Sequence, residues 1–501
     1  MADLHLVIDR SEGGLAAQIA RELRGAIRSG RLARGTRLPA TRELARDLGL
    51  SRGVVVEAYE QLVAEGFLDA RTGAGTTVAV TPPRPADRGP GEGGPGEGGA
   101  GEDGPDAGGA GGGVGEGGGE PGRRGCWPHY GHRPTSPDLG AFPRQTWLAA
   151  VRHVLATLPN DGLDYGDPGG VPEVREELAA YLCRVRAADA EAESLLVVTG
   201  VAQGLSLVIH VLAEAAGREI VLAVEDPTSV RQLPLLRRAG ARLVPVPVDA
   251  DGVVVEALAR SGAEAVVVTP AHQYPTGVVL SPGRRAELVA WAAETGAVVL
   301  EDDYDAEFRF DRDPVGCLQG LAPGRVVLAG SVSKALAPGL RLGWIVAPPA
   351  VARAVRRARG EFDLGSPVLD QYVLAHLIRT GAYDRHLRRM RREYRDRRDA
   401  LVLALAESLP WLRVHGISAG LHMYAELVDP SACQASALVA AAWSAGLSAE
   451  PVTHMAEPEA RASGGPLRPG FVLGFARLPP HRITQAVRDM AALIDHPDVR
   501  T

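Results

Sequence analysis

Apolar residues near the N-terminus recur at helical spacing. The first run predicts an amphipathic helix whose buried stripe is Leu15, Ile19, Leu23 and Ile27. A second helix is predicted over Thr41 to Leu48, Gly49 makes a turn, and Ser51 is a good N-cap for a third helix. The next stretch, GFLDARTGAGTTVAV, predicts two short strands around a Gly-rich turn. Two helices joined by a glycine turn and followed by a two-stranded wing are typical of a winged helix-turn-helix over about residues 10–80.

Beyond residue 125 the pattern changes to alternating strands and helices. Short apolar runs predict strands at Leu195–Val198, Ile220–Val224, Ala265–Val268, Ala297–Leu300, Val326–Leu328 and Trp344–Val346. Amphipathic segments such as Arg284–Thr295 separate many of them. This alternation predicts a mainly parallel α/β sheet covered on both faces. From about Val351 the chain is more helical, which predicts a second, smaller α/β subdomain within the domain 126–497.

The segment 81–125 separates the two patterned regions. It consists almost entirely of Gly, Pro, Glu, Ala and Asp, with no aromatic residue, and carries a net charge of −4. Such a segment has almost no apolar surface to bury, so we expect a disordered tether with an r.m.s. span of roughly 35–40 Å.

Bulk composition narrows the class of protein. The 501 residues carry a net charge of −7 and are 45% hydrophobic, values that are ordinary for a globular protein. The four cysteines are scattered and fit free thiols in a reducing cytosol. No signal peptide or membrane-spanning run is visible, so a cytoplasmic protein without membrane contact is expected.

Charge is concentrated in the predicted winged helix. The stretch from Arg21 to Arg52 holds nine arginines against three acidic residues, a local net of +6. One interpretation is a small helical docking domain with a solvated basic face. The other is a domain that binds double-stranded DNA, in which the starts of the second and third helices and the wing turn would contact the duplex through Arg42, Ser51, Arg52 and Gly75.

A second basic run lies near the C-terminus. Residues 385–398 include eight arginines in fourteen positions on a predicted helix. A solvated helix face with acidic partners at Glu393, Asp396 and Asp399 is one interpretation, and a supplementary DNA or interdomain contact is the other.

Lys334 is the only lysine, and the other 53 basic residues are arginines. A lysine can survive by chance on a surface. Alternatively, it is kept where an amine must lose its proton and attack a carbonyl, which arginine cannot do. Its neighbours favour this second reading, because the strand-like VVLAG leads directly into Ser331-Val332-Ser333-Lys334, and Arg341 follows seven residues later.

A second strand-like run ends in Glu301-Asp302-Asp303-Tyr304. A carboxylate at the end of a buried strand is costly unless it is paired, and a protonated heterocyclic nitrogen is a suitable partner. Carboxylate, phenol, lysine and a phosphate-holding arginine are the groups that hold pyridoxal 5′-phosphate.

These motifs resemble known families. The region from about Pro134 to Asp495, with LDYGDPGG, TPAHQYPTG, EDDYDAEFRF and SVSKALAPGLRLGW, resembles class I, fold-type I aminotransferases. The N-terminal region resembles GntR-type winged helix-turn-helix domains. Joined by a long linker, the two resemble MocR/GabR/PdxR-type transcription regulators, which implies a homodimer.

The resemblance also implies roles for single residues. Lys334 would form a Schiff base with the cofactor, Asp302 would pair with its ring nitrogen and Tyr304 would reach the ring oxygen. The remaining cofactor contacts would come from Ser331, Ser333, Arg341, Ala202, Gln203, His272 and, from a partner subunit, Tyr165. Taken alone, His272 is more typical of a structural histidine than of a ligand. Pro275 is expected after a cis peptide bond. The effector carboxylate would bind Arg231, with Arg477 as a weaker candidate.

Five positions depart from the family pattern. Val201 replaces a glycine in the phosphate loop, where a serine is also lost to Gly200, and Ser229 replaces the tyrosine that commonly stacks on the ring. Val332 stands for a phenylalanine. Val472 stands where aminotransferases carry the arginine for the substrate α-carboxylate.

Three functions are consistent with these features. The favoured one is a cofactor-dependent transcription regulator that senses an amine, an amino acid or pyridoxal phosphate itself. The second is a working aminotransferase that carries a DNA-binding module, against which Val472 counts. The third is a regulator that has lost its cofactor, against which the retention of Lys334, Asp302, Tyr304 and Arg341 counts.

Overall fold

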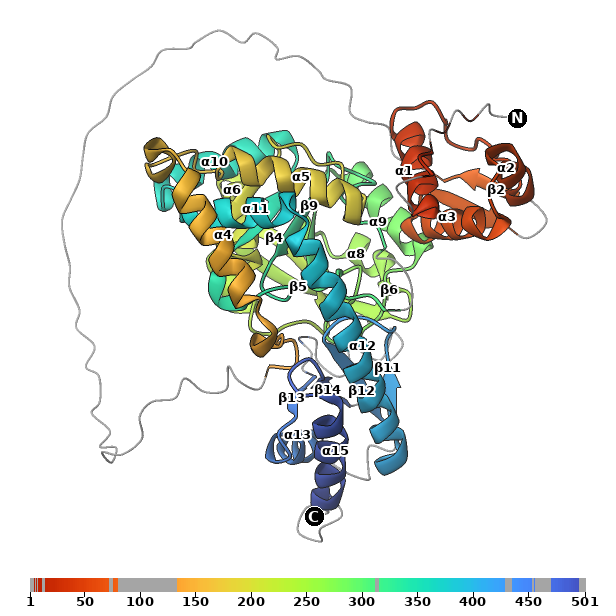
Figure 1. The fold of residues 1–501 in the computed structure, drawn as a ribbon, viewed down its shortest axis with the longest axis vertical. Coiled ribbons are helices and arrows are strands. Elements are labelled where there is room, and N and C mark those ends of the chain that lie inside the picture. Colours follow the sequence, from red (N-terminus) through yellow and green to blue (C-terminus); the bar gives the residue numbers. More distant parts are fainter. Residues whose placement is uncertain are drawn as a thin grey trace, which may run out of the picture.

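The computed structural model places two structured regions beside each other (Figure 1). It describes residues 4, 6, 8–10, 14–71, 75–79, 133–310, 315–428, 435–452, 455 and 470–494. The predicted linker, residues 81–125, lies outside the described residues. No helix in these ranges is both long and apolar enough to cross a membrane.

The N-terminal region is the predicted winged helix-turn-helix. Helices α1 (Leu15–Arg28), α2 (Thr41–Leu48) and α3 (Arg52–Glu65) precede an antiparallel pair of strands, β1 (Leu68–Arg71) and β2 (Gly75–Val78). Gly49 ends α2 in the left-handed region, at φ 61°, which a glycine adopts without strain. Ser51 occupies the N-cap position of α3, although its hydroxyl makes no capping hydrogen bond.

The large region is built on an eight-stranded sheet in the order β3-β10-β9-β8-β7-β4-β5-β6. All six strands predicted from the sequence are present, and β10 and β6 run antiparallel to their neighbours. The strands are β3 (Leu195–Val198), β4 (Ile220–Asp226), β5 (Ala241–Asp249), β6 (Gly252–Val253), β7 (Ala265–Val268), β8 (Val298–Asp303), β9 (Val326–Ser331) and β10 (Gly343–Val346).

Helices cover both faces of this sheet, as the continuous apolar runs of its strands require. One face packs on α6 (Val201–Ala216), α7 (Leu233–Arg238) and α10 (Pro349–Phe362). The other face packs on α5 (Pro172–Arg186), α8 (Val255–Arg260), α9 (Pro282–Thr295) and α11 (Val368–Arg379), with α4 (Arg144–Thr157) outside α11. Short 3-10 turns lie at η2 (Leu139–Ala141), η3 (Asn160–Leu163) and η4 (Pro338–Leu340).

The C-terminal subdomain has its own antiparallel sheet in the order β11-β12-β14-β13. Its strands are β11 (Leu412–His415), β12 (His422–Leu427), β13 (Ser448–Pro451) and β14 (Gly470–Gly474), and the long helix α12 (Ala382–Ser408) connects it to the large region. Helix α13 (Ala435–Ser444) packs on β13, β14 and α15 (Pro480–Ile494), and α15 packs on α12 (Figure 1).

The arginines of the second basic run lie on α12, and several of them bind carbonyl oxygens of other segments. Arg391 donates to Glu307, Arg395 donates to Phe310 over 2.8 Å, and Arg389 donates to Ala141 over 3.0 Å. Arg397 donates to Ala476 and forms an ion pair with Asp138. These arginines therefore fasten α12 to the surrounding loops. Two of the three predicted acidic partners are also present, because Glu393 pairs with Arg389 and Arg397 and Asp399 pairs with Arg398.

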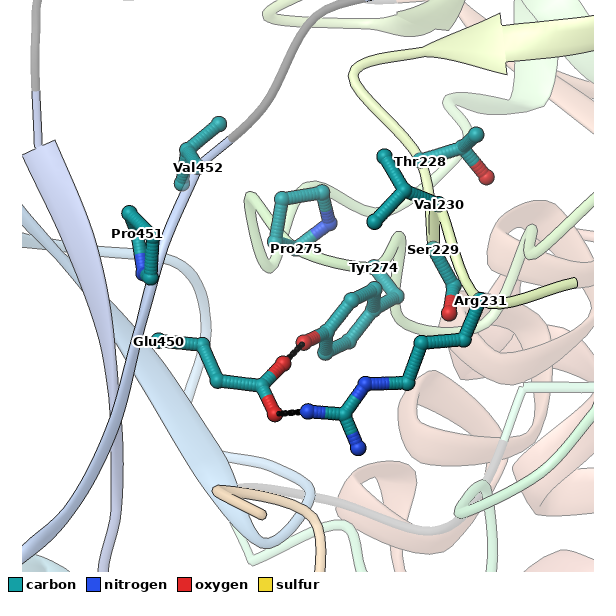
Figure 2. Close-up of a pocket in the computed structure, with 9 residues that line it drawn as sticks. All are labelled: Thr228, Ser229, Val230, Arg231, Tyr274, Pro275, Glu450, Pro451 and Val452. Atoms are coloured by element: carbon teal, nitrogen blue, oxygen red, sulfur yellow. Dashed lines mark hydrogen bonds and ion pairs between the residues drawn. The ribbon is translucent and has the colours of Figure 1, made fainter. Parts of the chain in front are cut away.

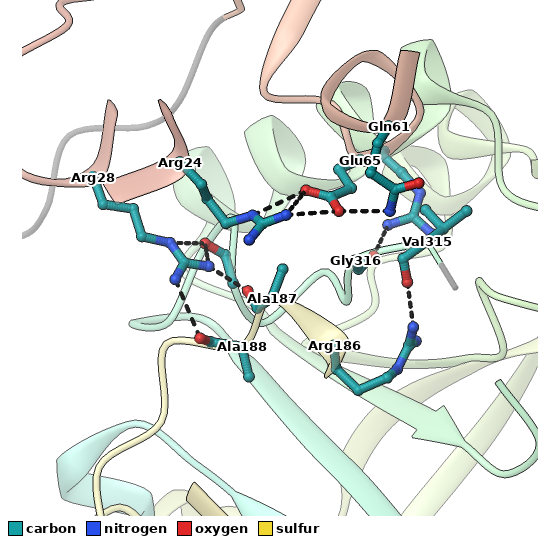
Figure 3. A network of polar contacts seen from close by, with 11 residues as sticks. Arg24, Arg28, Gln61, Glu65, Arg186, Ala187, Ala188, Val315 and Gly316 are labelled. Atoms are coloured by element: carbon teal, nitrogen blue, oxygen red, sulfur yellow. Dashed lines mark hydrogen bonds and ion pairs between the residues drawn. The ribbon is translucent and has the colours of Figure 1, made fainter. Parts of the chain in front are cut away.

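The winged helix packs on the large region through one arginine and a glycine-rich loop (Figure 3). Arg28 at the end of α1 donates to the carbonyl oxygens of Ala187, Ala188 and Gly320, the last two over 3.1 and 3.0 Å. A Cβ atom at Gly320 would lie 2.4 Å from the Arg28 guanidinium and 2.0 Å from the Ala187 oxygen, so only glycine fits there.

Apolar contacts and a buried ion pair complete this interface. Leu318 and Leu321 of the loop 315–321 are buried in the same hydrophobic cluster as the core of the winged helix. Beside them, Arg24 and Glu65 form a buried, bidentate ion pair at 2.8–3.0 Å that joins α1 to α3. The two regions thus share one continuous apolar core at their contact.

Candidate functional site

Lys334 lies just beyond the C-terminal end of β9, where the sheet opens toward the small subdomain. Its Nζ donates to the Thr135 hydroxyl over 3.0 Å. Burial lowers the pKa of Lys334 to about 8, while the carboxylates of Asp305 and Asp302 oppose this shift. Near neutral pH a larger share of these amines is therefore neutral and nucleophilic than for a solvated lysine, which is almost fully protonated.

Asp302 ends the neighbouring strand β8 with an oxygen that lacks a partner. Its side chain is buried, Oδ2 accepts a long hydrogen bond of 3.4 Å from Gln232, and Oδ1 makes no hydrogen bond with any described residue. Burial raises the pKa of Asp302 to about 7, and the bond from Gln232 and the charge of Lys334 counteract it. A buried, unpaired carboxylate oxygen is costly, so this geometry favours a cationic or donor group beside it.

A cluster of aromatic and imidazole rings lies next to these residues. The Tyr304 hydroxyl donates to the His272 carbonyl oxygen over 2.9 Å, and His272 Nδ1 lies 3.0 Å from Asp305. The ring of His422 lies 4.7 Å from that of His272, centroid to centroid. His272 is thus a buried histidine with a partner, as the structural interpretation expects, and it lies within the candidate site. The peptide bond before Pro275 is cis, as expected.

An anion-binding arrangement lies where β3 leads into α6. Gly200 is the N-cap residue of α6, with φ 117°, and no side chain caps the helix. A Cβ atom at Gly200 would lie 3.0 Å from the Arg341 guanidinium, which places this cation at the helix N-terminus. Ser331 lies near Gly200, because both contact Gly343, the strand partner of Ser331. A Cβ atom at Gly343 would lie 2.8 Å from the Gly200 Cα and 3.1 Å from the Ser331 Cβ. A helix N-terminus and an arginine are a ready phosphate site.

Other predicted cofactor contacts fall at the margin of this arrangement. Ala202 is half-buried in the first turn of α6, and Ser333 donates its N–H to Ser331 over 3.4 Å. Gln203 bonds to Thr199 and, over 2.7 Å, to Asp363, so its amide is held by the protein itself. The Tyr165 side chain is 84% exposed and lies outside the site within this chain.

The departures at Val201 and Val332 have ordinary packing explanations. Val201 packs against the apolar cluster under α6. Val332 is fully buried in the main core. Ser229 lines a small cavity at the entrance to the site.

Arg231 and the small subdomain meet across this entrance (Figure 2). The Arg231 guanidinium forms an ion pair with Glu450 of β13, and the Tyr274 hydroxyl donates to the other oxygen of Glu450 over 3.1 Å. The cavity between them has a volume of about 20 Å³, which is room for about one water molecule.

The two remaining positions of the predicted effector site are less favourable. Arg477 is exposed just beyond β14 and makes no polar contact with the residues that the structure describes. Val472 is buried in β14, where it pairs with Glu450 of β13. The position of the expected α-carboxylate arginine is therefore apolar, and its neighbour on the next strand is acidic.

The predicted DNA-binding residues lie on the surface of the winged helix. Arg42 is exposed in the first turn of α2, and Ser51 and Arg52 are exposed at the start of α3. Gly75 starts β2 with φ 87° and packs against the Arg37 side chain. The tip of the wing, residues 72–74, lies outside the described residues.

Sequence analysis missed several residues that the fold brings to the site. Thr135 lies 199 positions from Lys334 and Glu450 lies 219 from Arg231, and no local pattern marks either pair. Asp305 could have been predicted from the sequence, since it is the next acidic residue of the EDDYDAEF motif. Its partner is the histidine of TPAHQYPTG.

Comparisons with known proteins agree with both halves of the chain. Residues 15–78 match the gntR family of bacterial regulatory proteins, and residues 138–446 match aminotransferase class I and II. Enzymes of the latter family are in general dependent on pyridoxal phosphate.

Two relatives match most of the chain. The "Probable rhizopine catabolism regulatory protein MocR" of Rhizobium meliloti is 31% identical over 97% of this chain and 95% of its own length. The pyridoxine biosynthesis transcriptional regulator PdxR of Corynebacterium glutamicum is 33% identical over 84% and 85%, respectively.

Solved structures match the large region and its C-terminal subdomain. An archaeal alanine:glyoxylate aminotransferase superposes with a TM-score of 0.63 and 25% identity, over 72% of this chain and 89% of that one. An α-aminoadipate aminotransferase of Thermus thermophilus gives 0.62 and 25%, over 72% and 91%. With its helix-turn-helix domain and its aminotransferase domain both matched, this chain belongs to the MocR-type transcriptional regulators.

Proposed function

We propose that this regulator binds pyridoxal phosphate at Lys334 and senses an amine, an amino acid or the cofactor itself. The observation that carries the proposal is the buried, unpartnered Oδ1 of Asp302 close to a lysine with a lowered pKa. A protonated pyridine nitrogen would supply the missing partner, and the neutral amine of Lys334 would supply the nucleophile for the cofactor aldehyde.

The residues of the site fit this cofactor. Asp302 would hold the ring nitrogen, Tyr304 and His272 would lie along the ring, and Arg341, Ser331 and the N-terminus of α6 would hold the phosphate. The cofactor supplies an aldehyde that captures amines reversibly and an electron-withdrawing ring. The protein contributes the orientation and the charge balance of the site.

Full transaminase turnover is less well supported by this site. Turnover requires a firm hold on the α-carboxylate of both amino and keto acids, and Val472 supplies no charge for it. We therefore favour sensing over catalysis as the function of the aminotransferase domain.

A continuous set of contacts connects this site to the winged helix. Successive residues of β8 point to opposite sides, as in any strand. Asp302 faces the site, whereas Glu301 accepts the backbone N–H groups of Leu318 and Gln319, both over 3.0 Å. The loop 315–321 therefore rests on the strand that carries Asp302, and Arg28 of the winged helix binds the same loop.

The docked position also covers one face of the recognition helix, whereas Ser51 and Arg52 at its start stay exposed. Val56, Glu60 and Val63 of α3 line a cavity of about 580 Å³, and residues 279–282 of the large region form its opposite wall. A duplex, whose major groove alone is about 12 Å wide, does not fit into this space. We propose that effector binding shifts this docking and so changes how the helix meets DNA.

The chain is proposed to act as a cytoplasmic homodimer. Large apolar side chains are exposed on α4, around η3 and after α10, among them Leu155, Leu163, Tyr165, Phe362 and Leu364, each at least 56% exposed. A second copy would cover them and bring Tyr165 toward its site. Light scattering on the purified full chain is expected to give twice the monomer mass of 52.6 kDa, and a monodisperse monomer would contradict the dimer.

Binding to DNA fragments selected from sheared genomic DNA tests the regulatory function. We expect the affinity of the full chain for its selected fragments to change when pyridoxal phosphate is added. Arg52→Gln is expected to weaken binding by roughly 10–100-fold, the effect of one lost base or phosphate contact. Arg28→Gln is expected to keep DNA binding but to lose its dependence on pyridoxal phosphate, because the winged helix no longer docks.

Matched arginine variants control this experiment. Arg353→Gln on α10 and Arg31→Gln, exposed three residues after Arg28, remove the same charge without these contacts. A cofactor response that survives Arg28→Gln unchanged would refute the proposed route, and equal losses in Arg52→Gln and Arg353→Gln would refute the DNA contact.

A further inference from the structure

The effector entrance carries a fixed negative charge where the sequence predicts a binding site for a carboxylate. Arg231 is the predicted carboxylate ligand, but Glu450 already forms an ion pair with it (Figure 2). Glu450 pairs in register with Val472, the position expected to hold the second carboxylate-binding arginine. The small subdomain thus presents a carboxylate on the strand next to the one where an arginine is expected.

The two partners of this ion pair differ in how readily they can be displaced. The Arg231 side chain is 44% exposed, whereas that of Glu450 is 20% exposed and also accepts the Tyr274 hydroxyl. Arg231 can therefore move into solvent at little cost, as is usual for exposed ion pairs. If the Glu450 carboxylate moved away, it would lose two hydrogen-bond donors at a less accessible position. Glu450 is therefore expected to stay in place and to require a positively charged partner.

We infer that Glu450 sets the charge selectivity of the effector site, which favours amines whose far end is also positively charged over amino acids of the same length. The inference rests on the proposed function, because it assumes that the near amine reacts at the cofactor. A diamine would place its second ammonium beside Glu450 and release Arg231. A carboxylate at Arg231 would have to displace Glu450.

Another cation near this site is Arg133. Arg133 lies close enough to Lys334 and Tyr274 for its charge to lower the pKa of both. Glu450, in contrast, raises the pKa of both residues, so it belongs to the same electrostatic neighbourhood. A carboxylate held at Arg133 would respond less to a change at Glu450 than one held at Arg231, the direct partner of Glu450, and this difference separates the two binding modes.

Three amines with the same number of carbon atoms, four, test the inference. They are butane-1,4-diamine, butylamine and 4-aminobutanoate. They are titrated into the full chain loaded with pyridoxal phosphate, and binding is followed by absorbance and by calorimetry. The diamine is expected to bind most tightly and 4-aminobutanoate most weakly. In Glu450→Gln the diamine is expected to lose roughly 10–100-fold in affinity, the value of one charge-assisted hydrogen bond, and 4-aminobutanoate to gain.

Two further variants keep the outcome unambiguous. Arg231→Gln is expected to bind the diamine at least as well as the natural chain, because Glu450 loses its competing partner. Glu264→Gln removes a glutamate that pairs with Arg218 elsewhere on the surface and is expected to change none of the affinities. Tighter binding of 4-aminobutanoate than of the diamine, or an order unaffected by Glu450→Gln, would overturn the inference. Failure of the proposed function would appear differently, as the absence of any absorbance band after pyridoxal phosphate is added.

Discussion

Replacing Lys334 with alanine is expected to abolish covalent attachment of pyridoxal phosphate completely. The natural chain should develop an absorbance band near roughly 410–430 nm when the cofactor is added, as lysine adducts of this aldehyde do. Lys334 is the only lysine, so borohydride reduction should label one internal peptide and no other. Its pKa of about 8 further predicts that attachment becomes faster as the pH rises toward 8, because the neutral amine is the attacking species.

Lys334→Arg provides the matched control for this prediction. It preserves a positive charge near Asp302 and Asp305 but cannot condense with an aldehyde. Both variants should therefore lack the band, while noncovalent uptake of the cofactor through Arg341 and the α6 N-terminus remains measurable by calorimetry. A band that persists in either variant would place the attachment at another amine. A natural chain without a band would instead support the third hypothesis, a regulator without cofactor.

The secondary structure of both regions could be predicted because it depends on local patterns. The three helices of the winged helix and six strands of the large sheet lie where apolar spacing placed them. The antiparallel direction of β10 could not be predicted, since strand direction depends on pairing with β3 and β9, which come from distant segments. The same limit hid the docking of Arg28 on the carbonyls near Ala187, more than 150 residues away.

The site shows the same division between local motifs and long-range contacts. Lys334, Asp302 and Tyr304 were identifiable because each follows an apolar run, and the ends of neighbouring strands meet at one edge of a sheet. Glu450 was not identifiable, because its meaning comes from Arg231 and from its register with Val472. A motif therefore predicts the chemistry that a site can perform, but the charge that selects the ligand can come from a distant strand.

Replacing Arg186 with glutamine is expected to cause the largest loss of stability among the single changes considered. Arg186 is buried at the end of α5 and binds both oxygens of Asp303, over 2.7 and 2.8 Å. Burial opposes its charge, but the attraction and hydrogen bonds of Asp303 hold the pKa of Arg186 above its ordinary value. Removing one partner of such a pair leaves a buried charge uncompensated, which costs about 3–5 kcal/mol.

Thermal unfolding of the full chain measures this loss. For a region of this size the cost corresponds to a decrease of roughly 4–7 °C in the melting temperature of the large region. Arg218→Gln, which removes an arginine from the exposed pair with Glu264, is the control and should leave the melting temperature unchanged. Equal melting temperatures for the two variants would show that the Arg186–Asp303 pair contributes no more than an exposed one.

The consequences of Arg186→Gln should extend beyond stability. Arg186 also donates to the Val315 carbonyl oxygen at the start of the loop 315–321, and its partner Asp303 follows Asp302 in β8. A double variant, Arg186→Met with Asp303→Leu, removes both buried charges and should recover part of the lost stability, because no unpaired charge remains. It would still lack the bond to Val315. If that bond helps to couple the cofactor site to the winged helix, the double variant should be stable and bind pyridoxal phosphate, yet its DNA affinity should respond less to the cofactor than that of the natural chain.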